Sequence, residues 1–185
     1  MFNDDSTSLS VTLSDSQPMP QPDPPAPLPE HAADTAFHEA GHAVIALILG
    51  RPVQRVSIRA KEQTLGRCEF QKGRVRPSDD WLEREILIAL AGLAAEARYT
   101  GQYAWAGAAR DLQNVQLLAR QRSGERQAER LQKRMLSKVE HLLSQPATWR
   151  AVELIAVELL RHETISGRAA VHLLGQGKSQ AGDLE

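Results

Sequence analysis

Apolar residues recur along this chain with two different spacings, and these spacings predict its elements. Between residues 34 and 49 the apolar positions lie three or four residues apart, which predicts an amphipathic helix that ends at Gly50-Arg51-Pro52. Residues 53–58 and 65–70 are instead short segments of β-branched or alternating apolar residues, separated by a polar turn. These two segments predict a small antiparallel pair of strands.

The rest of the chain carries only helical patterns. An Ala- and Leu-rich segment at 79–99 predicts a buried helix, and a loop at 101–107 follows it. Further helices are predicted at 108–121, 125–144, 147–162 and 167–174. The predicted fold is therefore α+β: mostly helical, with a small antiparallel sheet beside the first helix.

The chain has 185 residues, enough for one ordinary domain and too few for two comfortable ones. Residues 1–30 are acidic and then rich in proline, which fixes φ and lacks an N–H donor, so we expect a disordered arm. Such an arm can dock on a partner, but a plain tether is the favoured interpretation. Residues 31–176 are expected to form the folded domain, and residues 177–185 a disordered tail.

Charge is distributed unevenly along the sequence. The first fifty residues hold seven acidic residues and no Lys or Arg, whereas the remainder carries 22 basic and 16 acidic residues. A basic residue recurs every fourth position between 122 and 138, and we interpret this stripe as a solvated helix face. We expect no nucleic-acid partner, because no recognised nucleic-acid motif accompanies it. The stripe consists of Arg122, Arg126, Arg130, Arg134 and Lys138.

Other features bear on the cellular compartment. Cys68 is the only cysteine, so no intramolecular disulfide can form, which fits a reducing compartment. The N-terminus has neither the positive region nor the apolar stretch of a secretory signal. The longest apolar runs fall well short of the roughly 18 residues that span a bilayer. We therefore expect a soluble, cytoplasmic protein with no membrane span.

The predicted first helix carries the motif His-Glu-x-x-His, formed by His38, Glu39 and His42. Four residues advance a helix by slightly more than one turn, so both imidazoles project from the same face. Two such nitrogens can hold one zinc ion, and the intervening glutamate can act as general base towards a zinc-bound water. A chance occurrence of the motif is expected about once in a few hundred chains of this length.

A catalytic zinc requires a third protein ligand. The candidates are acidic residues and the remaining histidines, and spacing alone does not choose among them. Those histidines are His31, His141, His162 and His172.

The segment from His38 to Ala43 resembles the zinc motif of the FtsH-type membrane-anchored, ATP-dependent metalloproteases. Four further segments resemble that family in the same order along the chain. They are the strand pair from Pro52 to Gly66, Leu90–Glu96, Gly107–Leu112 and His162–Gly167.

The resemblance implies a role for each matching residue. His38 and His42 would bind Zn²⁺, Glu39 would be the catalytic base, and the family's third zinc ligand falls on Asp111. The alternative for Asp111 is a first-turn acid that the helix dipole stabilises. Glu96 is assigned to orienting a ligand histidine, and it is the replacement ligand if Asp111 fails.

The sequence departs from the family at several positions. Leu93 stands where the family has Arg, and Val115-Gln116 replaces its Ala-Thr pair. The family's ATPase module and membrane anchors have no counterpart in the sequence, so we expect a stand-alone peptidase domain.

The motif and the resemblance together predict a zinc-dependent endopeptidase. Without an unfolding motor, it is expected to cleave flexible or unfolded polypeptides, alone, as a homo-oligomer or with a separate ATPase in trans. The expected strand at 65–70 would present a free edge to an extended peptide. The departures at Leu93 and Val115-Gln116 motivate an alternative, a catalytically inactive peptidase-like module that binds or regulates. The intact Glu39 favours the enzyme.

Overall fold

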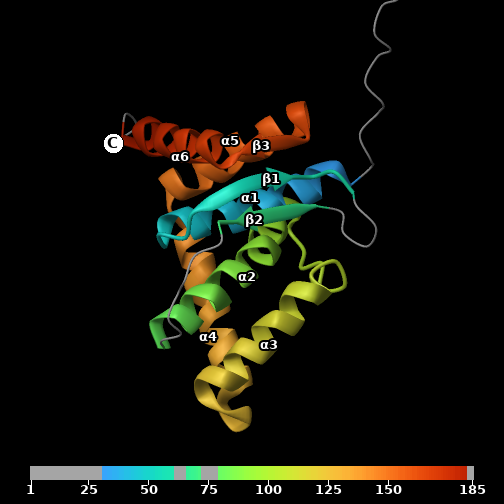
Figure 1. The fold of residues 1–185 in the computed structure, drawn as a ribbon, viewed down its shortest axis with the longest axis vertical. Coiled ribbons are helices and arrows are strands. Elements are labelled where there is room, and N and C mark those ends of the chain that lie inside the picture. Colours follow the sequence, from blue (N-terminus) through green and yellow to red (C-terminus); the bar gives the residue numbers. More distant parts are fainter. Residues whose placement is uncertain (1–30, 61–65, 72–78, 183–185) are drawn as a thin grey trace, which may run out of the picture.

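The computed structural model describes residues 31–60, 66–71 and 79–182, and of residues 79, 80, 181 and 182 it describes only the backbone. Six helices and three strands are present in this part of the chain (Figure 1). In chain order they are α1 (Ala32–Ile48), β1 (Val53–Ser57), β2 (Arg67–Phe70), α2 (Asp79–Thr100), α3 (Ala109–Ser123), α4 (Glu125–Ser144), α5 (Pro146–His162), β3 (Thr164–Ser166) and α6 (Gly167–Gly182). The predicted α+β class, mostly helical with a small antiparallel sheet, is confirmed.

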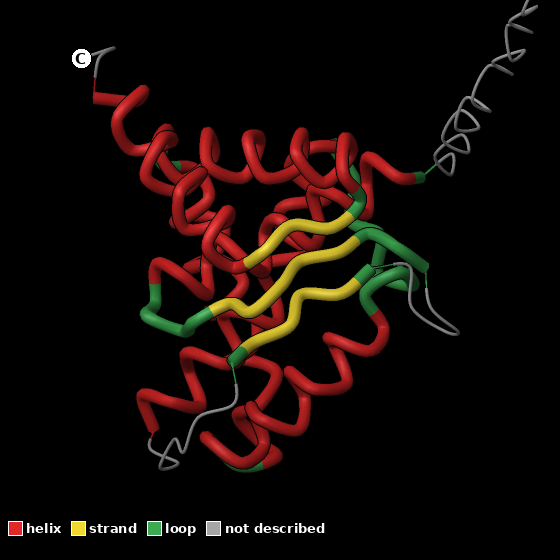
Figure 2. Tube along the Cα trace, turned by 45° about the horizontal axis from the view of Figure 1, so that its top comes forward, coloured by secondary structure: helices red, strands yellow, loops and turns green. Residues whose placement is uncertain are grey.

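The sheet has three strands rather than the two that the sequence predicted. Its order is β2-β1-β3, and Figure 2 shows the three strands side by side. On β1, Val56 pairs with Cys68 of β2 on one side and with Ile165 of β3 on the other. A strand of three residues is too short to show an alternating pattern in sequence, which is why β3 was not predicted.

Helix α1 lies in the centre of the molecule and packs against the sheet, α2 and α5. Its crossing with α2 is close because Gly41 has no side chain. A Cβ at Gly41 would lie 2.5 Å from the Ala91 carbonyl oxygen and 2.5 Å from the Ala95 Cβ. This close approach places the histidine face of α1 directly against α2.

Helices α2, α3 and α4 pack together below the sheet (Figure 1). The inner face of α4 buries residues three or four apart, while its outer face carries most of the basic stripe. Arg122 and Arg134 approach Glu83 of α2 at 3.4 and 3.6 Å, whereas Arg126 and Arg130 are exposed to solvent. The buried residues are Ala128, Leu131, Met135, Val139 and Leu143.

Helix α6 continues to Gly182, beyond the end that the sequence predicted at Leu174. Gly177 lies inside this helix and serves packing. It is buried, and a Cβ there would lie 2.7 Å from the backbone nitrogen of Ala151 in α5. Glycine at this position therefore lets α5 and α6 approach closely.

Some predictions fall outside the described residues. They concern the arm at 1–30, the start of the second strand at Leu65 and the last three residues of the tail. Among the described helices, none is both long enough and apolar enough to cross a bilayer.

Candidate metal centre

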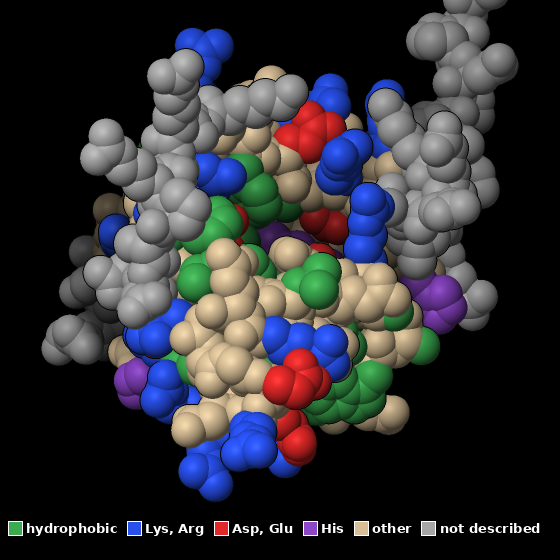
Figure 3. Space-filling view, turned by 60° about the horizontal axis from the view of Figure 1, so that its bottom comes forward, with side chains coloured by type: hydrophobic (Ala, Val, Ile, Leu, Met, Phe, Trp, Pro, Cys, Tyr) green, Lys and Arg blue, Asp and Glu red, His purple; other side chains and the backbone are tan. Residues whose placement is uncertain are grey.

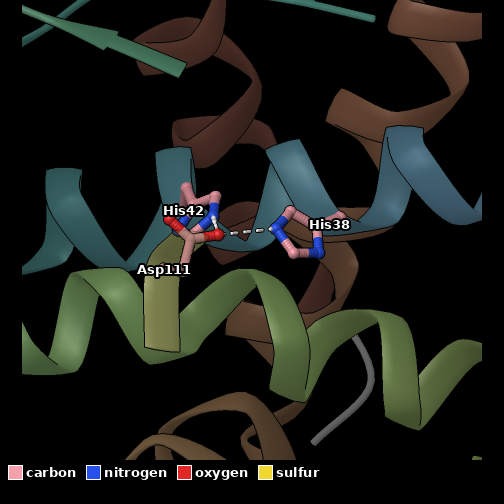
Figure 4. Close-up of side chains that lie close together, drawn as sticks. All are labelled: His38, His42 and Asp111. Atoms are coloured by element: carbon pink, nitrogen blue, oxygen red, sulfur yellow. Dashed lines mark hydrogen bonds and ion pairs between the residues drawn. The ribbon is translucent and has the colours of Figure 1, made fainter. Parts of the chain in front are cut away.

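The two histidines and the glutamate of the motif lie on the buried face of α1. His38, Glu39 and His42 are 9, 6 and 7% exposed, respectively. Asp111, in the first turn of α3, brings a carboxylate to the two imidazoles (Figure 4). Its Oδ2 lies 3.2 Å from the Nε2 of His38 and 3.4 Å from the Nε2 of His42. These three ligand atoms form the one group in the described chain that could hold a metal ion.

Helix α2 orients both histidine rings through their other nitrogens. The Nδ1 of His38 lies 2.8 Å from Oε2 of Glu96, and the Nδ1 of His42 donates to the carbonyl oxygen of Ile88 at 2.7 Å. A carbonyl can only accept, so His42 carries its proton on Nδ1 and, when neutral, has a lone pair on Nε2. Hydrogen bonds of this kind fix the ring orientation of metal-binding histidines.

The space between the two rings fits a metal ion. A Cβ at Gly92 would lie 2.4 Å from the Nε2 of His42 and 2.5 Å from the Nε2 of His38, so only glycine leaves this space open. Two ligands at about 2.05 Å from one tetrahedral ion are separated by about 3.3 Å. The measured separations of 3.2 and 3.4 Å between Asp111 and the imidazoles agree with that value. Two imidazoles and one carboxylate are also a donor set that zinc accepts.

Without a metal ion, the same groups form an ion-paired cluster. Burial lowers the pKa of His38, but hydrogen bonds to Asp111 and Glu96 outweigh this effect and raise its pKa to about 9. Burial opposes ionisation of Asp111, but hydrogen bonds to His38 and His42 hold its pKa well below the usual range. His38 is therefore protonated at neutral pH in the metal-free protein, and metal binding there requires loss of that proton.

Glu39 lies beside this cluster with one carboxylate oxygen uncommitted. Burial raises its pKa, while the charges of His42 and His38 and a hydrogen bond from the backbone N–H of Cys68 act in the opposite direction. Gly66 packs on the other oxygen, since a Cβ there would lie 2.7 Å from Oε1. Oε2 is buried and has no hydrogen-bond partner among the described residues. A buried carboxylate with a raised pKa and a free oxygen suits proton transfer.

The other histidines that the sequence allowed as a third ligand are not part of this group. His31 is exposed and approaches Asp34 at 3.3 Å, and His162 approaches Glu158 at 3.4 Å. Sequence reasoning also missed the contributions of Ile88, Gly92 and Cys68. Two of these act through backbone groups, which leave no trace in residue identity, and Gly92 acts through the absence of a side chain.

Comparison with known proteins identifies the family. The model of peptidase family M41 matches residues 28–125, more than half of the chain. The chain belongs to peptidase family M41. The match covers α1, the β1–β2 pair, α2 and α3, and so includes all the residues of the candidate metal centre.

Three curated relatives show how far this similarity extends. The chain is 34% identical over 90 residues to the ATP-dependent zinc metalloprotease FtsH of Protochlamydia amoebophila. It is 38% identical over 95 residues to FtsH 1 of Thermomicrobium roseum, and 32% over 93 residues to a chloroplastic FTSH of Medicago sativa. Each match covers 46% of this chain but only 10, 14 and 13% of the respective relative. The similarity to these relatives thus concerns a small part of their length.

Proposed function

We propose that this M41 chain is a zinc-dependent endopeptidase. In this proposal His38, His42 and Asp111 bind the zinc ion, Glu39 is the general base, and Glu96 orients His38. The observation that carries it is the convergence of two imidazole Nε2 atoms and one carboxylate beside a buried glutamate with a free oxygen. The names of the similar proteins, all zinc metalloproteases, support the choice of metal and reaction class.

The mechanism follows from the position of each side chain. When bound, zinc would polarise the scissile carbonyl and lower the pKa of a water molecule towards neutrality. Glu39 accepts the proton of the attacking water at Oε2, where no described residue competes for it, and then transfers this proton to the leaving amine nitrogen. Glu96 and the Ile88 carbonyl hold the imidazole rings in place throughout.

The substrate in this proposal is an extended polypeptide. The strand order leaves the outer edge of β2 without a partner strand among the described residues. This edge adjoins the centre, because Gly66 and Cys68 both contact Glu39. A polypeptide that pairs with β2 must be extended, so the domain would cleave flexible or unfolded chains. A folded substrate would require prior unfolding, for which a separate ATPase or a homo-oligomeric assembly is the proposed partner.

The test combines metal analysis with a cleavage assay. Purified protein should contain about one zinc per chain, and the zinc-loaded protein should hydrolyse an unstructured peptide. Glu39→Gln is nearly isosteric and leaves the three metal-binding residues intact, so it should retain zinc and lose turnover. Cleavage that survives this substitution would exclude Glu39 as the base, and a zinc-loaded wild type that cleaves nothing would refute the enzyme.

That last result would favour the inactive binding module. Of the sequence departures that motivate it, Leu93 and Val115 are fully buried, whereas Gln116 is exposed. None of the three is one of the metal-binding or proton-transferring residues of this proposal. The departures therefore leave the proposed chemistry intact, and the enzyme remains our proposal.

A further inference from the structure

Strand β2 carries an unpaired positive charge beside the candidate active centre. Arg67 is exposed, and it makes no ion pair or hydrogen bond within the described chain. Its neighbours Gly66 and Cys68 contact Glu39, and the Cys68 side chain packs against the hydrophobic core on the inner face of the sheet. Successive side chains of a strand point to opposite faces, so Arg67 projects from the outer face, next to the free edge.

The other charges on this outer face are neutralised. Arg55 of β1 pairs with Glu69 of β2 at 2.8 Å, and Arg59 pairs with Glu163 at 2.7 Å. Arg67 is thus the remaining uncompensated charge of β2. Figure 3 shows a hollow with histidine and acidic side chains at its base and Lys and Arg side chains along part of its rim.

We propose that Arg67 determines substrate specificity: the site prefers extended polypeptides with Asp or Glu at the one position that lies opposite Arg67. This inference rests on the proposed pairing of the substrate with β2. In such a pair, opposite residues have Cβ atoms about 4.5–5.5 Å apart, within reach of an arginine–carboxylate contact. The immediate neighbours of that acidic residue point to the other face. Acidic residues at those neighbouring positions should therefore give no advantage.

The size of the preference follows from the exposure of Arg67. Exposed ion pairs shift affinity by up to about five-fold, because water and side-chain entropy weaken them. Salt screens them further, since the Debye length falls from about 10 Å at 0.1 M to about 3 Å at 1 M. A residue two positions along the substrate would lie opposite Glu69, which Arg55 already neutralises, and no preference for a basic residue is expected there.

Binding measurements on the full chain can test this preference apart from catalysis. The zinc-loaded Glu39→Gln variant is titrated into fluorescent, unstructured peptides that carry Asp at one scanned position, each with an Asn and a Lys counterpart. One position should favour Asp by up to about five-fold at low salt, and the preference should vanish near 1 M salt. Adding Arg67→Gln should remove the preference, and Arg67→Glu should reverse it in favour of Lys. Arg130→Gln, the same change at an exposed position on α4, should leave it intact.

Three results would overturn the inference: no position that favours Asp, an unchanged preference in Arg67→Gln, or no peptide binding at all. Failure of the proposed enzyme is a separate result. The proposed enzyme fails if the wild-type protein cleaves no peptide. The charge preference is measured separately, as peptide binding to the Glu39→Gln variant, which does not need to cleave the peptide.

Discussion

Replacing Gly92 with alanine adds one methyl group at the centre of the proposed zinc site. The new Cβ would lie 2.4 Å from the Nε2 of His42, 2.5 Å from the Nε2 of His38 and 2.6 Å from the Cδ2 of His38. A zinc ion lies about 2.0–2.1 Å from each such nitrogen, so the methyl group and the ion would compete for one space. Gly92→Ala should therefore abolish high-affinity zinc binding.

The magnitudes separate this effect from unfolding. Alanine gains about 1 kcal/mol over glycine inside a helix, while overpacking typically costs 1–3 kcal/mol, so the metal-free variant should lose at most about 2 kcal/mol. Loss of a residue that merely orients a ligand already lowers metal affinity about 10–100-fold. Displacing both imidazoles should exceed that range, to a loss of more than about 100-fold.

The assay is competition for zinc with a chromogenic chelator, with circular dichroism as a check on folding. Gly175→Ala provides the matched control, because it makes the same change inside a helix at a position where a Cβ would meet nothing within 4 Å. That control should keep wild-type zinc affinity. A folded Gly92→Ala protein that still binds one zinc ion with wild-type affinity would refute the placement of the metal between the two rings.

Three further predictions follow from the same contacts. Glu96→Gln keeps a hydrogen-bonding group near His38 but removes its charge, so zinc affinity should fall about 10–100-fold in the chelator assay while folding is unchanged. The pKa of His38, raised from 6.5 to about 9 in the metal-free fold, adds stability that is complete below pH 6.5 and is lost as pH rises through 9. Urea unfolding of chelator-treated protein should show this decline, and zinc affinity should rise over the same interval. Gly177→Ala should destabilise the fold by about 1–2 kcal/mol in urea, because its Cβ would lie 2.7 Å from Ala151, whereas Gly175→Ala should be neutral or stabilising.

The features that the sequence predicted best are those that depend on local backbone geometry. The spacing of His38 and His42 places both rings on one face of a helix, and the structure has them there, with ring centroids 4.8 Å apart. The six helices were predicted for the same reason, since a 3.6-residue period persists over many residues. The fold class then followed from the number and type of these elements.

What sequence alone could not supply depends on contacts between distant segments. Asp111 lies 73 residues from His38 along the chain, and only the packing of α3 on α2 brings the two together. Residue spacing alone did not identify the third zinc ligand, and Asp111 was suggested by the family resemblance. Strand β3 was missed because three residues show no alternating pattern, and the pairing with β1 that defines it joins residues more than a hundred positions apart.

Helix α2 explains why the centre depends on interhelical distance rather than on the motif alone. Ile88, Gly92 and Glu96 recur every four residues, so they lie on one face of α2 and meet two histidines that are one turn apart on α1. The carbonyl of Ile88 and the carboxylate of Glu96 orient the rings, and Gly92 leaves the space between them. All three contacts require the close crossing that Gly41 permits between His38 and His42. A wider crossing would separate both rings from the groups that orient them, while the His-Glu-x-x-His spacing on α1 remained unchanged.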